Sequence, residues 1–395
     1  MLLFDAGTRK DMTPASYSEG QFAFLNRVAG PFWDEVRSLL ESWFSNYPSE
    51  AHASLRSRFR SSESGFWGAY WELLLHEVLL RIGANVQVDP VVPGGRRPDF
   101  VAEFDGEHIM VEATVLLDPE SERRSEARRA PVLDALQQLE TSSYWINVEV
   151  VAEGPDQASG RRLRSQVQEW IDGLDPSTVE QAPKVRGKDG VVRSFEDRGW
   201  RIEVTAIRRG EGHFYPTTGF HLGPVRGRWV DDHAAIRNDL RNKARKYRDA
   251  QMPLVLAVLN TRWTASEEEL ALALYGPAWE HPGMMKARRI NPSWRSVPEG
   301  LWITRSGPRY KDVVAVLASS HVAPPAVARA SLTLWHNPDA STLAGLPFDH
   351  VIVDQASGSL ERQPSSVRLH ELFGLSPDWP PGEPFPGRSR RRTSG

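Results

Sequence analysis

Two carboxylates in the first third of the sequence, Asp99 and Glu112, are the strongest candidates for chemistry. Both belong to the stretch RRPDFVAEFDGEHIMVEATVLL, residues 96–117. Asp99 begins one run of alternating apolar residues, Glu112 lies in the next, and an Asp-Gly turn signal separates the two runs. A hairpin formed by these runs would bring Asp99 across from Glu112. The alternative is an ordinary surface hairpin, in which Asp99 only starts a strand or a turn.

Carboxylates that meet in a partly buried site are typical of metal centres. Their repulsion raises the pKa of the pair unless a cation lies between them. Mg²⁺ is held by one or two carboxylates together with water and a substrate phosphate, and Mn²⁺ is a second candidate. Such a metal can polarise a phosphoryl oxygen and lower the pKa of an attacking water. Glu112 lies among apolar residues, where an unpaired carboxylate is unfavourable, and this setting favours a functional role.

A predicted helix precedes the hairpin and carries two further acids. It covers GFWGAYWELLLHEVLLRIG, residues 65–83, and contains Glu72 and Glu77. Either acid could instead be an ordinary helix residue without a role in chemistry. His76 lies between them, and a lone His in an apolar helix is expected to be a hydrogen-bonded core residue rather than a metal ligand.

The order of these features resembles the PD-(D/E)XK nuclease superfamily, whose fold is called restriction-endonuclease-like. The matching features are a Glu-bearing helix, the dipeptide Pro98-Asp99, a short hairpin and the tripeptide Glu112-Ala113-Thr114. The resemblance covers residues 66–117 and extends more loosely to Asn260. It implies an α/β fold with a mixed sheet flanked by helices.

The resemblance also implies a function. Asp99 and Glu112 would bind Mg²⁺ or Mn²⁺, and Glu72, or less favourably Glu77, would support the metal or its waters. The expected reaction is hydrolysis of phosphodiester bonds in nucleic acid, in DNA in preference to RNA, within a restriction or defence role. Many members of the superfamily act as dimers, so the resemblance also implies a homodimer or a partner protein.

One position departs from the superfamily pattern. Thr114 stands where a lysine is expected to position water and stabilise developing charge, and a hydroxyl cannot supply that charge. The superfamily is known to move this lysine to a neighbouring element. A predicted helix over residues 232–250 offers Lys243 and Lys246, about one turn apart on the same face. We expect one of them to act as the catalytic lysine.

Two alternatives remain open from the sequence. If neither lysine reaches the carboxylates, the chain would be a catalytically inactive nuclease-fold protein that binds nucleic acid or serves as a scaffold. If Asp99 and Glu112 point to opposite faces of the hairpin, the protein would be an unrelated α/β enzyme. The position of a lysine amine relative to the two carboxylates therefore separates the hypotheses.

The composition limits the possible classes of protein. The 395-residue chain is 40% hydrophobic, with 14 Trp and 15 Phe, which is ample for a buried core. It has no Cys, which excludes disulfides, thiolate metal sites and a Cys nucleophile. The formal net charge of -3 gives no global attraction for nucleic acid, so binding would rest on local patches. Four tryptophans could stack on bases, although most aromatic residues pack in cores: Trp279, Trp294, Trp302 and Trp335.

The arrangement of predicted elements indicates how these residues are held. Strands and helices interleave, which favours an α/β sheet covered on its faces, with the apolar strand at residues 252–260 in its centre. No apolar run approaches the roughly 20 residues of a membrane span, and Asp5 interrupts the apolar stretch that a signal peptide needs, so a cytoplasmic protein is expected. The expected parts are an N-terminal helical accessory region, a nuclease-like core, a C-terminal extension with additional strands and a flexible tail, over residues 1–62, 63–276, 277–376 and 377–395.

Overall fold

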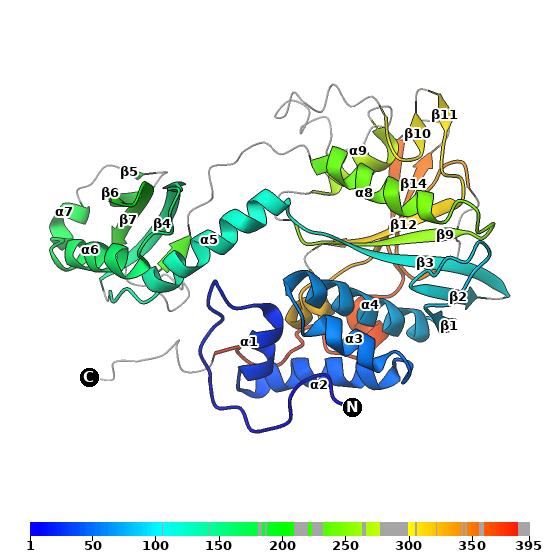
Figure 1. Ribbon diagram of the computed structural model, residues 1–395, viewed down its shortest axis with the longest axis horizontal. Helices are drawn as coiled ribbons and strands as arrows, with labels where there is room; N and C mark the ends of the chain where they lie inside the picture. The colour runs from blue at the N-terminus through cyan, green and yellow to red at the C-terminus, as the bar shows by residue number, and fades with distance from the viewer. Residues whose placement is uncertain are drawn as a thin grey trace. The chain divides into compact units, whose positions relative to one another are not determined.

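Strands from distant parts of the chain pair into one mixed sheet (Figure 1). In spatial order they are β1 (Asn85–Val88), β2 (Phe100–Phe104), β3 (Glu107–Leu116), β9 (Leu254–Asn260), β12 (Val313–Ser320), β13 (Thr333–His336), β14 (Asp349–Asp354) and β15 (Ser359–Gln363). Strands β2 and β3 pair antiparallel, whereas β3, β9 and β12 run parallel to one another. The apolar strand expected at the centre is β9, which is buried along its whole length. The expectation of a mixed α/β sheet is confirmed.

The computed structural model describes a defined part of the chain. The described residues are 1–104, 106–141, 143–180, 184–185, 188–208, 220–222, 232–262, 266–276, 299–304, 306–320, 322–340, 343, 346–354 and 359–385. They belong to two units of structure. The first unit comprises residues 1–12, 20–118 and 229–384, and the second comprises residues 13–19, 119–228 and 385–395.

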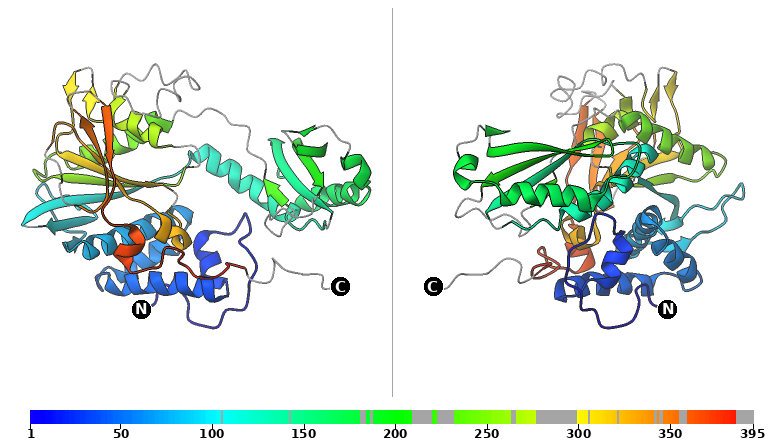
Figure 2. Two further views of the ribbon diagram at one scale, coloured as in Figure 1. Left: turned by 180° about the vertical axis from the view of Figure 1, so that it is seen from behind. Right: turned by 60° about the vertical axis from the view of Figure 1, so that its left-hand side comes forward.

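Helices cover both faces of the sheet in the first unit (Figures 1 and 2). They are α4 (Glu63–Arg81) on one face and α8 (Asp232–Lys246) and α9 (Glu267–Tyr275) on the other. Because side chains alternate along a strand, β3 contributes to both layers. Met110 packs in the same core as Leu240 of α8, whereas Val111 lines a small apolar hollow with Val78 of α4. Residues 110, 112 and 114 of β3 therefore face α8.

The N-terminal helices pack with the last described segment of the chain. These helices are α1 (Gln21–Arg27), α2 (Pro31–Asn46) and α3 (His52–Phe59), and the short helix α11 is Leu369–Phe373. The ring of Trp43 lies 4.9 Å from the ring of Phe373, and the indole N–H of Trp33 donates to the carbonyl oxygen of Pro384 (2.9 Å). Trp379 is also buried. The segment from residue 377 to 384, expected to be part of a flexible tail, is thus anchored at Trp379 and Pro384, and residues 386–395 lie outside the described part.

The unit boundaries differ from the expected ones. Residues 119–228, expected to belong to the nuclease-like core, form most of a separate unit. The strands expected in a C-terminal extension instead continue the main sheet, because β12 pairs with β9 up to Ser320↔Asn260. The reason is that period-2 patterning identifies a strand but not its partner.

The second unit is an insertion between β3 and α8 with a hydrophobic core of its own. Its sheet has the order β5 (Lys184–Val185), β6 (Lys188–Asp197), β7 (Trp200–Arg208), β4 (Tyr144–Ala152) and β8 (Phe220–Leu222), and its helices are α5 (Glu120–Leu136), α6 (Gly160–Asp172) and α7 (Pro176–Glu180). Ile146 of β4, Leu163 of α6 and Trp200 of β7 are fully buried in this core. The chain that leaves the Glu112 strand therefore passes through a complete α/β unit before it returns in the helix of Lys243 and Lys246.

The remaining elements of the first unit complete its core. They are the hairpin of β10 (Ile303–Thr304) and β11 (Gly307–Pro308) and the 3-10 helix η3 (Pro324–Arg329). Trp302 and Trp335 are 0% and 1% exposed, so they are core residues, as expected for most aromatic residues, and they cannot stack on bases. Trp279 and Trp294 lie outside the described residues. Among the helices that the structure describes, none combines the length and apolar character that a membrane crossing requires.

Candidate active site

The β2–β3 hairpin brings Asp99 and Glu112 together. Phe100 pairs with Val111, so the next position outward places Asp99 across from Glu112. The backbone N–H of Ala113 donates to Oδ2 of Asp99 (2.7 Å), which turns the Asp99 side chain toward β3. Burial raises the pKa of Asp99, and the charge of Glu112 adds to this effect. The register of the hairpin and this hydrogen bond therefore place Asp99 beside the Glu112–Ala113 segment of β3.

Glu112 is held by two lysines of α8 and by Tyr247, the residue that directly follows this helix. Its side chain is only 2% exposed. The Lys243 amine lies 2.8 Å and the Lys246 amine 3.3 Å from Oε1, and the Tyr247 hydroxyl donates to Oε2. Lys243 also lies 3.4 Å from the carbonyl oxygen of Ala113. Both lysines predicted from the sequence therefore reach the carboxylate that follows the Pro-Asp hairpin.

The spacing of these residues on α8 explains why all three converge. Positions three and four apart lie on one face of a helix, and Lys243, Lys246 and Tyr247 have this spacing. Leu240 and Ala244 are buried in the sheet core and fix the rotation of the helix. Tyr247 was not among the predicted site residues. Its spacing from Lys243 was the only available signal, and an aromatic residue at that position is equally typical of a core.

Glu72 and Glu77 have different roles although both lie on α4. The guanidinium of Arg58, on α3, pairs with both oxygens of Glu72, with Nη2 2.6 Å from Oε2. Burial and the charge of Glu112 raise the pKa of Asp99, and the charge of Glu72 adds to this effect, so Glu72 lies within electrostatic range of Asp99. Glu77 is 1% exposed and accepts hydrogen bonds from Asn46 (3.0 Å) and Arg81 (2.8 Å). Glu72 is therefore held by Arg58 of α3, whereas Glu77 is held by Asn46 and Arg81 within the helical layer.

His76 is a core residue, as expected, but its Nδ1 is buried without a hydrogen-bond partner among the described residues. It is buried, its ring lies 4.7 Å from that of Tyr47, and burial lowers its pKa to about 4. A neutral, buried imidazole of this kind contributes to packing.

Replacing Glu77 by Gln is expected to reduce stability without changing chemistry. The change removes the charge that pairs with Arg81 and alters the contact with Asn46, at a cost of roughly 1–3 kcal/mol in the free energy of unfolding. If the protein has the nuclease activity that the resemblance implies, Glu72→Gln should show the opposite pattern, with nearly unchanged stability and reduced cleavage. Urea denaturation and kcat, measured on both variants, separate the two roles. Equal loss of kcat in both would contradict the assignment.

Asp99 carries the most unusual electrostatic environment of the candidate residues. Burial raises its pKa to about 7, and the charges of Glu112 and Glu72 add to this effect. The Ala113 N–H and the charge of Lys243 act in the opposite direction. A carboxyl group in this situation gains stability by taking up a proton or by sharing a cation with its acidic neighbours.

Without added metal, Asp99 is expected to reduce stability as the pH rises from about 4 to about 7, against the opposite contribution of His76 and His336, whose pKa burial lowers to about 4. The pKa of Asp99 is about 7 when folded, compared with the usual 3.8, so between these values the folded state binds more protons than the unfolded state. Unfolding temperatures across this range, with wild type beside Asp99→Asn, measure the contribution. The variant should lose the slope that this group causes; an unchanged slope would contradict the raised pKa.

No family model matches this chain, and no curated protein or solved structure matches it. Function is therefore inferred from the geometry and charge of the candidate site.

The carboxylates are chemically suited to a hard divalent cation. Mg²⁺ takes oxygen ligands and is usually bound through one or two carboxylates, with water and substrate oxygens completing its shell. Asp99 and Glu112 can supply such a pair, with Glu72 near enough to influence Asp99. Within the described part of the chain, no three His, Asp or Glu side chains are grouped so that they could hold a metal ion by themselves.

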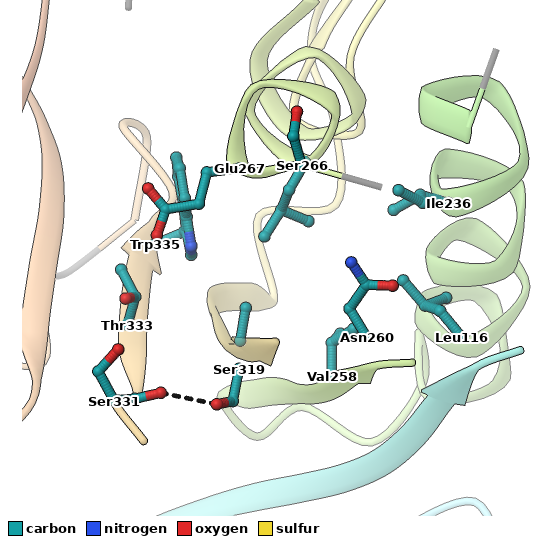
Figure 3. A pocket seen from close by; sticks show the side chains of 12 residues that line it. Leu116, Ile236, Val258, Asn260, Ser266, Glu267, Ser319, Ser331, Thr333 and Trp335 are labelled. Atoms are coloured by element: carbon teal, nitrogen blue, oxygen red, sulfur yellow. Dashed lines mark hydrogen bonds between the residues drawn. The ribbon is translucent and has the colours of Figure 1, made fainter. Parts of the chain in front are cut away.

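A hollow elsewhere in the first unit does not compete with this site. It lies beside the ends of β9 and β12, where Asn260, Ser319 and Thr333 line it, and the Ser319 hydroxyl donates to the carbonyl oxygen of Ser331 (2.6 Å) (Figure 3). Its volume is about 30 Å³, which is close to the volume of one water molecule in the liquid. It is too small for a nucleotide.

Proposed function

We propose that this protein is a Mg²⁺-dependent nuclease on a restriction-endonuclease-like core of the PD-(D/E)XK type. The observation that carries the proposal is the position of the Lys243 amine, 2.8 Å from Glu112. The charge of Lys243 also acts on Asp99, where it opposes the rise in pKa. This amine supplies the cation that Thr114 cannot supply. The proposed substrate is DNA in preference to RNA, and the proposed context is restriction or defence, as a homodimer or with a partner protein.

Asp99 and Glu112 would hold Mg²⁺ or Mn²⁺, with Glu72 supporting the metal or its waters. The metal, when bound, supplies a polarised phosphoryl oxygen and a water of lowered pKa. Lys243 donates N–H groups toward the attacking water or the phosphate, and Lys246 adds positive charge beside it. The reaction forms a P–O bond to water and breaks the P–O bond to a sugar oxygen. The attacking water gives up a proton, and the leaving oxygen takes one up.

The charge balance of the site favours an anionic substrate. Three carboxylates are matched by three cations: Glu72, Asp99 and Glu112 with Arg58, Lys243 and Lys246. A divalent cation would therefore make the site net positive. The three cations also have the more exposed side chains, at 44%, 35% and 42%, compared with 12% for Glu72 and 2% for Glu112. A phosphodiester that approaches this surface meets positive charge first.

A second candidate function is a catalytically inactive nuclease-fold protein that binds nucleic acid or serves as a scaffold. One observation favours it: both oxygens of Glu112 already have hydrogen-bond donors, from the two lysines and Tyr247. A buried carboxylate with these partners can be retained as part of a structural ion pair. A carboxylate can accept about four hydrogen bonds or metal contacts, so these donors leave capacity for a cation.

Cleavage assays separate the two candidates. Supercoiled plasmid, linear duplex, single-stranded DNA and RNA are each incubated with the protein in Mg²⁺, Mn²⁺ or EDTA. The proposed nuclease nicks or cuts at least one DNA substrate with metal and none in EDTA. Binding of these nucleic acids without cleavage under any metal condition would favour the inactive protein.

A further inference from the structure

Arg58 connects the N-terminal helical layer to the candidate site. It lies on α3, and both of its terminal nitrogens pair with the carboxylate of Glu72 on α4. Hydrogen bonding to Glu72 raises the pKa of Arg58, and the charge of Asp99 acts on it in the same direction. The guanidinium therefore lies within the electrostatic field of the candidate metal ligands, although no superfamily motif contains it.

We propose that Arg58 is a positioning residue that holds the Glu72 carboxylate beside Asp99, so that the N-terminal helical layer completes the active site. This inference rests on the proposed nuclease function. The N-terminal helices, which precede the Glu-bearing helix α4 in the sequence, would then take part in the reaction.

The contact has the geometry of a positioning interaction. A guanidinium that binds both oxygens of a carboxylate fixes its orientation as well as its location. A lysine at the same place could supply the charge but not the two parallel hydrogen bonds. Glu72 has three rotatable side-chain bonds, so a bidentate partner greatly narrows the positions that its oxygens can take.

The backbone that carries Arg58 is anchored on both sides. Leu55 and Phe59, on the inner face of α3, are fully buried, and the ring of Phe59 lies 4.6 Å from that of Phe66 on α4. A Cβ at Gly65 would lie 2.6 Å from the Arg58 carbonyl oxygen, so the end of α3 and the start of α4 are in close contact. A tightly joined helix pair can hold the ion pair in a fixed place.

Arg56 provides a matched control on the same helix. Its Nε donates to the carbonyl oxygen of Leu2 (2.7 Å), and its guanidinium lies 3.8 Å from Asp5. These contacts tie α3 to the N-terminal segment and involve none of the candidate site residues. Arg56→Gln therefore removes an arginine from α3 without disturbing Glu72.

The test is a double-mutant cycle with Arg58→Gln, Glu72→Gln and the double variant, measured by kcat, KM and unfolding temperature in Mg²⁺ with the DNA substrate that the wild type cleaves. We expect Arg58→Gln to lower kcat about 10- to 100-fold, the usual effect of losing a group that orients a metal ligand. The KM of Arg58→Gln should differ little from that of the wild type. Arg58→Lys should have a higher kcat than Arg58→Gln, and Arg56→Gln should have the wild-type kcat. The double variant should be no slower than Glu72→Gln, because Arg58 acts only through Glu72.

Three results would overturn the inference. The first is wild-type kcat and KM in Arg58→Gln. The second is a raised KM with unchanged kcat in Arg58→Gln, which would make Arg58 a substrate contact. The third is a double variant with a clearly lower kcat than Glu72→Gln. If Arg58→Gln does not fold, the double variant can still be compared with Glu72→Gln, because it removes both charges of the ion pair together. Failure of the wild type to cleave any nucleic acid or to bind Mn²⁺ would overturn the proposed function. An active wild type with an unaffected Arg58→Gln variant would overturn this inference alone.

Discussion

Replacing Asp99 by Asn is expected to reduce Mg²⁺-dependent DNA cleavage by about 10³-fold or more. A metal contributes several kcal/mol of transition-state stabilisation, and each 1.36 kcal/mol corresponds to about a factor of ten in rate. The amide keeps the shape of the side chain and can still accept from the Ala113 N–H, but it removes the charge that attracts the cation. The variant should fold, because the carboxylate is destabilised where it stands by burial and by its acidic neighbours.

Asp89→Asn is the control for this change. Asp89 is an exposed acid close to the same hairpin, where its side chain pairs with Arg97 (3.1 Å) and its backbone N–H donates to the carbonyl oxygen of Asp99 (2.9 Å). Its charge is not expected to contribute to the metal site, so this variant should keep the wild-type rate. Initial rates of plasmid nicking over a Mg²⁺ titration measure both variants. An Asp99→Asn protein that cleaves at the wild-type rate would rule out the proposed metal site.

Replacing Lys243 by Gln is expected to have the second largest effect, a loss of about 10²-fold in kcat, comparable to removing one donor that stabilises transition-state charge. Lys243 is the nearer of the two amines to Glu112, at 2.8 Å compared with 3.3 Å, and it is the one whose charge acts on Asp99. Folding should survive, because Lys246 remains to pair with the buried carboxylate.

Lys246→Gln is the matched comparison, since it removes the same charge from the same face of α8. Its amine lies over the ring of Tyr247, 4.8 Å from the ring centre, and is the more exposed of the two. A loss of kcat several-fold smaller than that of Lys243→Gln is therefore expected. Single-turnover rates, which report the chemical step, give the comparison. A larger loss of rate in Lys246→Gln than in Lys243→Gln would make Lys246 the main catalytic lysine. Wild-type rates in both variants would show that neither lysine takes part in the reaction.

Local patterns in the sequence predicted the elements that carry the candidate site. The helix from Glu63 to Arg81 and the buried strand β9 are apolar runs of helix and strand length, and the two strands of the Asp99–Glu112 hairpin flank an Asp-Gly turn signal. The helix of Lys243 and Lys246 was also predicted. Because strand alternation and helix spacing fix where side chains point, the meeting of Glu112 with these lysines could be anticipated from residue types and order.

Long-range partners could not be predicted in the same way. Arg58 reaches Glu72 from another helix, and Tyr247 reaches Glu112 from the turn that follows α8, and neither contact leaves a local pattern. The insertion of a complete unit after β3 was also missed, since its strands and helices have the same periodicities as those of the main core. Strand β15 has only one buried residue, Leu360, and so lacks the alternation that identifies a strand.

The central claim is that Asp99 and Glu112 together hold a divalent cation. Anomalous X-ray diffraction from crystals of the protein grown with Mn²⁺ tests it most directly, because the signal locates the ion without depending on substrate or turnover. The account predicts a Mn²⁺ peak in contact with oxygens of both Asp99 and Glu112, and no peak in crystals of Asp99→Asn. Crystals at saturating Mn²⁺ with no ion at this pair, and with Glu112 still bound only by Lys243, Lys246 and Tyr247, would contradict it.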